Sequence, residues 1–302
     1  MNIWSSLTIN RRRQILLSPA ILFLLGGIVF PMLIVAIVSI SRTADYGDIL
    51  WGKLSANAYI QFLFEQDLDE RKIFNLDYIF VFLRSLKLAL LTTFGCLILG
   101  FPTALFIALQ PVRRRNTLLI LVSIPFWANL LVRLYAWIIL LRDGGGIEQF
   151  LHWLHLKKDE LGLMYTSTAT AIGLLYAFIP FMILPIYASL EKIDWRLVDA
   201  ACDLGANRWQ ALRRIITPLA LPGIISGCTL VFVPTLGVYV IPDILGGSKS
   251  LMIGNLIHLQ YTSAHNWPFG AALSFVLLGL TLLGMLMCRF CSKRTGKMYE
   301  CV

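Results

Sequence analysis

The chain has 302 residues, of which 58% are apolar and only 14% are charged, and its formal net charge is +9. Soluble domains carry about 25% charged residues. A chain this poor in charge cannot cover itself with polar surface in water. The composition therefore excludes a soluble globular protein and indicates that lipid is the solvent.

Six long apolar runs predict membrane-spanning helices. Roughly 20 residues of helix cross the hydrocarbon core of about 30 Å. The runs are continuous and show no apolar–polar alternation, so helices are predicted rather than barrel strands. Their approximate bounds are 16–41, 79–109, 117–141, 166–190, 219–242 and 268–288. We therefore expect an all-α membrane protein in which residues 1–302 form a single transmembrane domain.

Basic residues are unevenly divided between the two sides of these spans. The side that holds both termini and the loop after Leu190 receives fifteen Lys and Arg residues, whereas the loops on the other side receive seven. Short loops rich in Lys and Arg stay in the cytoplasm. We therefore expect both termini in the cytoplasm. This topology accounts for most of the excess of basic residues. We predict that the chain contacts membrane lipids and binds no nucleic acid.

The sequence offers no catalytic, cofactor or metal site. It contains no Gly-x-x-x-x-Gly-Lys-Ser/Thr phosphate loop, so any ATP hydrolysis would have to occur on a separate chain. Cys288 and Cys291 have the spacing of half a metal site, but the second half is missing. We predict no catalytic residues, no bound metal and no cofactor.

The loop at residues 191–218 stands out from the apolar runs on either side. Asp194 can cap a short helix that runs to about Leu204, and Gly205 supplies a stop in the left-handed conformation. A second helix, at about 208–216, leads into the fifth span. Two interpretations remain open at this point: an amphipathic loop resting on lipid headgroups, or an element on which another protein docks.

The same loop resembles the "EAA" loop of the permeases of ABC importers. That pattern is an acidic residue, two alanines, three residues, a glycine, nine residues, an isoleucine, any residue, a leucine and a proline. Here the positions are Asp199, Ala200, Ala201, Gly205, Ile215, Thr217 and Pro218. Asp199 and Thr217 depart from the pattern, which has Glu and Leu there. The resemblance implies a coupling helix that seats in a groove of a cytoplasmic ATPase dimer.

Three further segments are similar to the permeases of spermidine/putrescine importers. They are Pro125–Trp137, Ile241–Gly247 and Asn266–Ala272, and the resemblance covers about residues 15–290. It implies the type I ABC importer permease (MetI-like) fold in a bacterial inner membrane. It also implies three partners: a second related permease, an ATPase dimer and a periplasmic polyamine-binding protein.

The third span carries candidates for the translocation path. Asn129, Arg133 and Trp137 are four residues apart and share one face of a helix. A membrane-centred arginine costs about 2.5–3.5 kcal/mol, so Arg133 should face protein or water. Because a bare arginine would repel a cationic solute, a structural or gating role is favoured over substrate contact. Trp127 and Tyr135 are further path candidates, with packing between helices as the alternative.

The fifth span carries a second candidate stripe. Thr235, Tyr239 and Asp243 repeat every four residues toward the outer mouth. An acid and an aromatic ring can hold an ammonium group by charge pairing and cation–π contact. Alternatively, Asp243 only caps a helix end after Pro242.

Two rival functions remain. The leading hypothesis is a permease for polyamines, but the EAA-like loop is indifferent to cargo, so an ABC permease for another small solute is a rival within the same class. A secondary transporter driven by an ion gradient would need an acid or histidine within the spans for coupling. The spans offer essentially only Arg133 and the marginal Asp243, which disfavours this second rival.

Overall fold

A computed structural model describes residues 9–43, 49–55, 57–62, 64–66, 72–74, 76–153, 162–247 and 251–299. The chain divides into two compact units. Unit 1 comprises residues 1–75 and 259–276, and unit 2 comprises residues 76–258 and 277–302. Helices α11 (Ile253–Thr262) and α12 (Trp267–Tyr299) contribute residues to both units.

Unit 1 contains one long helix and several short elements. Strands β1 and β2 pair antiparallel, as do β3 and β4. No sequence signal predicts these strands, because such short segments show little alternation. The elements are α1 (Ile9–Ser39), β1 (Ser41–Thr43), β2 (Ile49–Leu54), α2 (Asn57–Gln61), β3 (Phe64–Gln66) and β4 (Lys72–Phe74).

Helix α1 is apolar from Leu17 to Ser39. Only 6% of its most apolar 18-residue window is buried, and Leu22 and Phe23 are 72% and 80% exposed. A helix that is hydrophobic all round must be surrounded by lipid or by other protein. Within unit 1, α1 therefore presents an apolar surface that lipid or other protein can cover.

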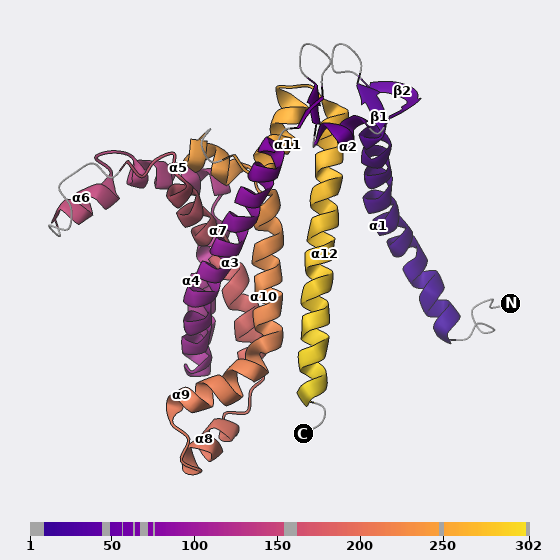
Figure 1. Ribbon diagram of the computed structural model, residues 1–302. Coiled ribbons are helices and arrows are strands. Elements are labelled where there is room, and N and C mark those ends of the chain that lie inside the picture. The colour runs from indigo at the N-terminus through magenta and orange to yellow at the C-terminus, as the bar shows by residue number, and fades with distance from the viewer. Residues whose placement is uncertain are drawn as a thin grey trace. The chain divides into compact units, whose positions relative to one another are not determined.

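Unit 2 is built on three long helices, α3, α7 and α10, which pack against one another (Figure 1). Glycines allow their close approach. A methyl group added to Gly100 of α3 would lie 2.9 Å from the Cγ of Met182 on α7. A methyl group added to Gly227 of α10 would lie 2.9 Å from the Sδ of the same Met182. Small residues at crossings are the usual basis of helix packing in membranes. The elements of unit 2 up to residue 247 are α3 (Asp77–Ala108), α4 (Val112–Trp127), α5 (Leu130–Leu141), α6 (Gly146–Trp153), α7 (Ser167–Leu190), α8 (Arg196–Asp203), α9 (Arg208–Ala211), the π-helix η2 (Leu212–Ile216), α10 (Thr217–Gly237) and the π-helix η3 (Pro242–Gly246).

The outer surface of these helices is apolar. Leu90, Phe94 and Phe106 of α3 are 55%, 65% and 57% exposed. In the described chain, five helices are long and apolar enough to cross a membrane, and α4 with α5 would make a sixth if the pair forms one span. The predicted all-α membrane fold is confirmed.

The third span differs from the prediction of one continuous helix over 117–141. α4 and α5 meet at an angle of 88°. Two local features explain the bend: Ala128 is extended, with φ −74° and ψ 143°, and the Asn129 side chain caps α5 by accepting from the Leu131 N–H at 2.9 Å. Pro125 also lacks the N–H that would continue the hydrogen-bond ladder. Arg133 therefore lies on a helix that turns away from α4 and packs against α7 and η3.

The fifth span also ends earlier than the predicted residue 242. α10 stops at Gly237, because Val238 is extended with ψ 133°. The chain then enters η3, which packs against α5 and α7. Two helix breaks, at 128–129 and 238–239, thus lead into two elements that pack against each other, α5 and η3.

Candidate coupling site and translocation path

The EAA-like loop folds as two short helices at one end of unit 2, below the ends of α3, α7 and α10 (Figure 1). α8 begins where the Asp194 carboxylate accepts the Arg196 N–H at 3.1 Å. Asp194 precedes the N-cap residue Trp195, which makes no side-chain cap bond, and Asp199, Ala200 and Ala201 lie within the helix.

Gly205 ends α8 with paired hydrogen bonds. The Gly205 N–H donates to the Cys202 carbonyl at 2.9 Å, and the Ala206 N–H donates to the Ala201 carbonyl at 3.0 Å. This is the Schellman arrangement, which needs a left-handed residue after the cap. Gly205 supplies it with φ +89°, and a Cβ there would meet no atom within 4 Å. The requirement for glycine is therefore conformational and not steric.

α8 has two faces with different environments. Trp195 just before it and Val198, Asp199 and Cys202 within it line a groove. Leu197, Ala200 and Leu204 lie about half a turn away on the opposite face, as expected from 3.6 residues per turn. Leu197 and Leu204 are 53% and 89% exposed, and Ala200 is exposed as well. The second face is thus an apolar surface open to a partner, which we name the outer face of α8.

The remaining residues of the pattern lie on a continuous helical segment that leads into α10. Asn207 and Gln210 form a reciprocal capping box that begins α9. The segment Arg208–Gly237 is then helical without a break through η2 and α10. Ile215 and Pro218 are half-buried along it.

Thr217 gives the π-helix η2 a side-chain support. Its N–H and its hydroxyl both donate to the Leu212 carbonyl, the hydroxyl at 2.9 Å. Pro218 has no N–H, so the ordinary α-helical ladder cannot continue through it. The Leu212 carbonyl, which is not the one that Pro218 leaves without a donor, accepts both bonds from Thr217 and so closes the π-turn. The Thr that departs from the pattern therefore has a structural role here.

The candidates on the third span separate into packed and exposed groups. Trp137 contacts the ring of Tyr176 on α7 edge-on, with centroids 5.5 Å apart. The Arg133 Nε is buried and has no hydrogen-bond partner among the described residues. Trp127 and Tyr135 are 80% and 62% exposed. Trp137 thus has a packing role, whereas Arg133, Trp127 and Tyr135 remain available to other groups.

The predicted stripe of Thr235, Tyr239 and Asp243 is wrong as a helical face, because the break at 238–239 divides it. Thr235 is fully buried and its hydroxyl donates to the Val231 carbonyl at 2.6 Å. Tyr239 lies in the break and is 41% exposed. Asp243 is exposed in the first turn of η3, where its charge suits the helix dipole.

Helix α11 supplies residues that sequence reasoning missed. Its Asn255 amide donates to the Tyr239 carbonyl at 3.0 Å, and the His258 ring stacks on Tyr239 at 4.6 Å. The Asn255 Oδ1 is buried without a partner among the described residues. Ser85 of α3 accepts the Ile253 N–H at 2.8 Å and holds the start of α11 in place. The only signal in the sequence for these contacts is Asn255, a single Asn in an apolar stretch.

Comparison with known proteins identifies the family. The model of the "binding-protein-dependent transport system inner membrane component" family matches residues 100–297. The spermidine/putrescine transport system permease protein PotB of Escherichia coli K12 is 46% identical over 209 residues, which are 68% of this chain and 76% of that protein. PotB of Haemophilus influenzae is 41% identical over 215 residues, 71% of this chain and 74% of that protein.

Solved structures show the same fold. A chain of the bacterial alginate ABC transporter, crystallised with an alginate-bound periplasmic protein, superposes with a TM-score of 0.75 at 17% identity, covering 97% of this chain and 98% of that chain. At this identity the likeness concerns the fold alone. Taken with the family match over residues 100–297, it agrees with the predicted importer-permease architecture. The chain therefore belongs to the family of binding-protein-dependent transport system inner membrane components.

Proposed function

We propose that this chain is the permease subunit of an ABC importer that carries the polyamines spermidine and putrescine into the cytoplasm. The observation that carries this proposal is the 46% identity to PotB over 76% of that protein. The three sequence segments similar to polyamine permeases support the same cargo. Like PotB, the chain would be one subunit of a larger transport system.

The energy would come from a separate ATPase dimer docked on the outer face of α8. Leu197, Ala200 and Leu204 form an exposed apolar patch of the kind that a partner groove can bury. The distribution of Lys and Arg favours a cytoplasmic location for this loop, where an ATPase is accessible. The absence of a phosphate loop from the sequence makes a separate ATPase necessary.

A second related permease would complete the path. α1 exposes apolar side chains all around, and only 6% of its most apolar window is buried. Lipid can cover part of this surface, and a neighbouring permease can cover the rest. A periplasmic polyamine-binding protein would deliver the solute on the opposite side from α8.

The solute would pass near the two helix breaks. Helix breaks in transporters expose backbone carbonyls that can hold cations. The break at 238–239 combines the half-exposed Tyr239 ring with the exposed Asp243 carboxylate in the following turn. Ring and carboxylate together suit an alkylammonium group. Arg133 would take a gating or structural part, with Trp127 and Tyr135 as further lining candidates.

The decisive experiment is uptake of labelled spermidine and putrescine by the complex reconstituted in vesicles with its ATPase, second permease and binding protein. We expect ATP-dependent accumulation of both polyamines. An alginate oligosaccharide serves as the control solute, since the same fold occurs in an alginate transporter. Accumulation of a control solute without polyamine uptake would assign a different cargo. Uptake driven by an ion gradient without ATP would contradict the proposal altogether.

A further inference from the structure

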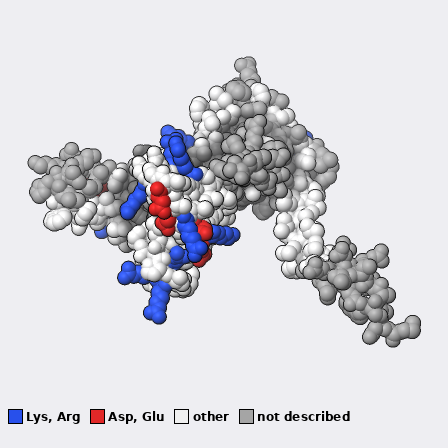
Figure 2. Space-filling view, turned by 90° about the horizontal axis from the view of Figure 1, so that it is seen from below, with Lys and Arg blue, Asp and Glu red and all other residues white. Residues whose placement is uncertain are grey.

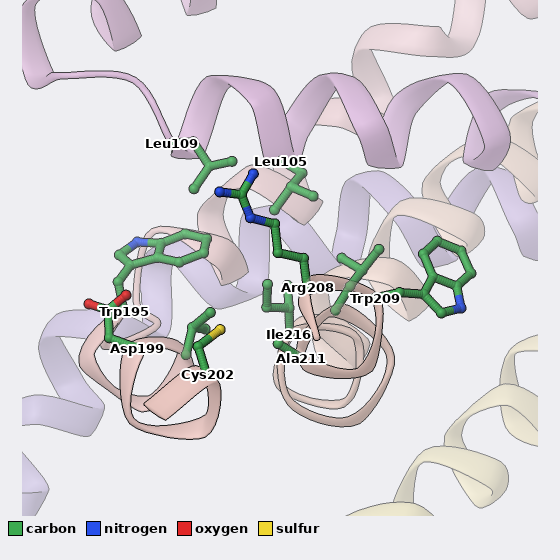
Figure 3. A pocket seen from close by; sticks show the side chains of 11 residues that line it. Leu105, Leu109, Trp195, Asp199, Cys202, Arg208, Trp209, Ala211 and Ile216 are labelled. Atoms are coloured by element: carbon green, nitrogen blue, oxygen red, sulfur yellow. The ribbon is translucent and has the colours of Figure 1, made fainter. Parts of the chain in front are cut away.

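A groove of about 930 Å³ separates the EAA-like loop from the end of α3 (Figure 3). Leu105 and Leu109 line it from the end of α3, and Trp195 and Val198 line it from the side of α8. It lies on the opposite face of α8 from the outer face described above. The groove is therefore distinct from the surface proposed for the ATPase.

Arg208 places a cation in this apolar groove. Figure 3 shows its guanidinium group directed toward Leu105 and Leu109. Asp199 also lines the groove, but no acid among the described residues lies within ion-pairing distance of Arg208. A guanidinium group binds phosphate through two parallel hydrogen bonds, so an anionic ligand suits it well.

The groove lies at the level where a span ends. α3 is an apolar span that stops at Ala108; Leu105 belongs to its last turn, and Leu109 is the C-cap residue that follows it. At such a level the hydrocarbon core gives way to phospholipid headgroups. Tryptophans such as Trp195 are enriched at this depth, because the indole has an apolar body and a polar N–H.

On the face seen from below, basic side chains outweigh acidic ones (Figure 2). Residues 109–116 and 191–218 together hold eight basic side chains and four acidic ones, Glu191, Asp194, Asp199 and Asp203. Such an excess attracts anionic lipids more strongly than zwitterionic ones. The basic side chains are Arg113, Arg114, Arg115, Lys192, Arg196, Arg208, Arg213 and Arg214.

We propose that this groove binds one anionic phospholipid of the leaflet on the α8 side. The phosphate pairs with Arg208, and the upper part of an acyl chain lies against Leu105, Leu109 and Trp195. A free inorganic anion would leave those apolar walls exposed to water, which is why a lipid is the occupant. The lipid would hold α8 against α3 and so make the coupling of the importer depend on lipid composition.

Lipid binding is tested by native mass spectrometry of the importer complex in detergent, titrated with dioleoyl phosphatidylglycerol or dioleoyl phosphatidylcholine. We expect Arg208→Gln to retain phosphatidylglycerol about tenfold less tightly, as expected for the loss of a charge-assisted hydrogen bond. Arg208→Lys keeps the charge and should retain most of the affinity. Arg213→Gln is the matched control, because Arg213 is exposed and lies outside the groove. Equal retention by wild type and Arg208→Gln would overturn the proposal.

The consequence is tested by ATP hydrolysis of the complex in vesicles, a measurement that does not depend on which solute is carried. Hydrolysis by wild type and by Arg213→Gln should rise several-fold when phosphatidylglycerol is added to phosphatidylcholine. Arg208→Gln should lose most of this stimulation, and added inorganic phosphate should not restore it. The alternative outcome is that the ATPase subunit dissociates from the Arg208→Gln complex to the same extent in both lipids. In that case the groove holds a segment of the ATPase, and the lipid proposal is wrong.

Discussion

The two ends of unit 2 follow different rules. At the α8 end, residues 191–218 form a short helix, a left-handed glycine and a long helix that leads without a break into α10. At the other end, which we call the α11 end, α5 and η3 follow helix breaks, and α5, η3 and the start of α11 are held by contacts distant in sequence. A continuous helix transmits force, whereas broken helices create polar sites. We therefore look for ATPase coupling at the α8 end and for solute recognition at the α11 end.

The largest expected effect is at Gly205. Gly205→Val should abolish ATP-dependent uptake, because a β-branched residue is strained at φ +89°. Gly205→Asn should keep much of the activity, since Asn tolerates the left-handed conformation. Uptake is measured at equal amounts of inserted protein, determined by immunoblot of membranes. Equal uptake by the two variants would contradict a conformational role of Gly205.

A large effect is also expected on the outer face of α8. Leu204→Glu should weaken ATPase association about tenfold or more, because it replaces the most exposed apolar side chain of the proposed contact with a charge. The measurement is the amount of ATPase that copurifies at graded ATPase concentrations. Asp203→Asn changes a neighbouring charge and serves as the control, with association expected within about twofold of wild type. If Leu204→Glu binds ATPase normally, the docking surface lies elsewhere.

At the α11 end, Asp243→Asn should raise the KM for spermidine several-fold and leave complex assembly unchanged. The expected magnitude follows from the loss of a charge-assisted hydrogen bond to an ammonium group, about 1.5–3 kcal/mol when fully formed and less at an exposed site. Asp143→Asn removes another exposed acid outside η3 and is the control. An unchanged KM in Asp243→Asn would reduce Asp243 to a residue that only stabilises the start of η3.

The smallest effect is expected at Thr217. Thr217→Val removes the hydroxyl that donates to the Leu212 carbonyl and should lower the free energy of unfolding by about 1 kcal/mol. Thr217→Ser keeps the hydroxyl and should unfold nearly as wild type does. Thermal unfolding in detergent gives the comparison. A stability loss in Thr217→Ser as large as in Thr217→Val would show that the methyl group, and not the hydrogen bond, supports η2.

Sequence reasoning works better at the α8 end because the signals there are local. Asp194 and Gly205 act on backbone groups within a few residues, so spacing alone predicts the start and the stop of α8, although the N-cap residue is Trp195 and not Asp194. Apolar content likewise predicts that a segment lies in the membrane. Apolar content carries no information about the direction of the helix axis, so it does not predict the 88° bend between α4 and α5.

The α11 end depends on pairs that no local pattern reveals. Ser85 and Ile253 are 168 residues apart, and their hydrogen bond brings Asn255 and His258 to Tyr239. Tyr239 and Asp243 were recognised as candidates, but their placement on one helical face with Thr235 was wrong. The reason is that the extended Val238 interrupts the periodicity on which the prediction depended.

The unbroken helix Arg208–Gly237 has a mechanical consequence. Its 30 residues make a rod of about 45 Å at 1.5 Å per residue. One end of the rod is the start of α9, beside the proposed ATPase contact, and the other end stops just before Tyr239. A tilt of about 5° pivoting at α9 would move the far end by about 4 Å, which is comparable to the width of an alkylammonium chain. Leverage along a single helix could therefore open or close the polar break without any change in that helix itself.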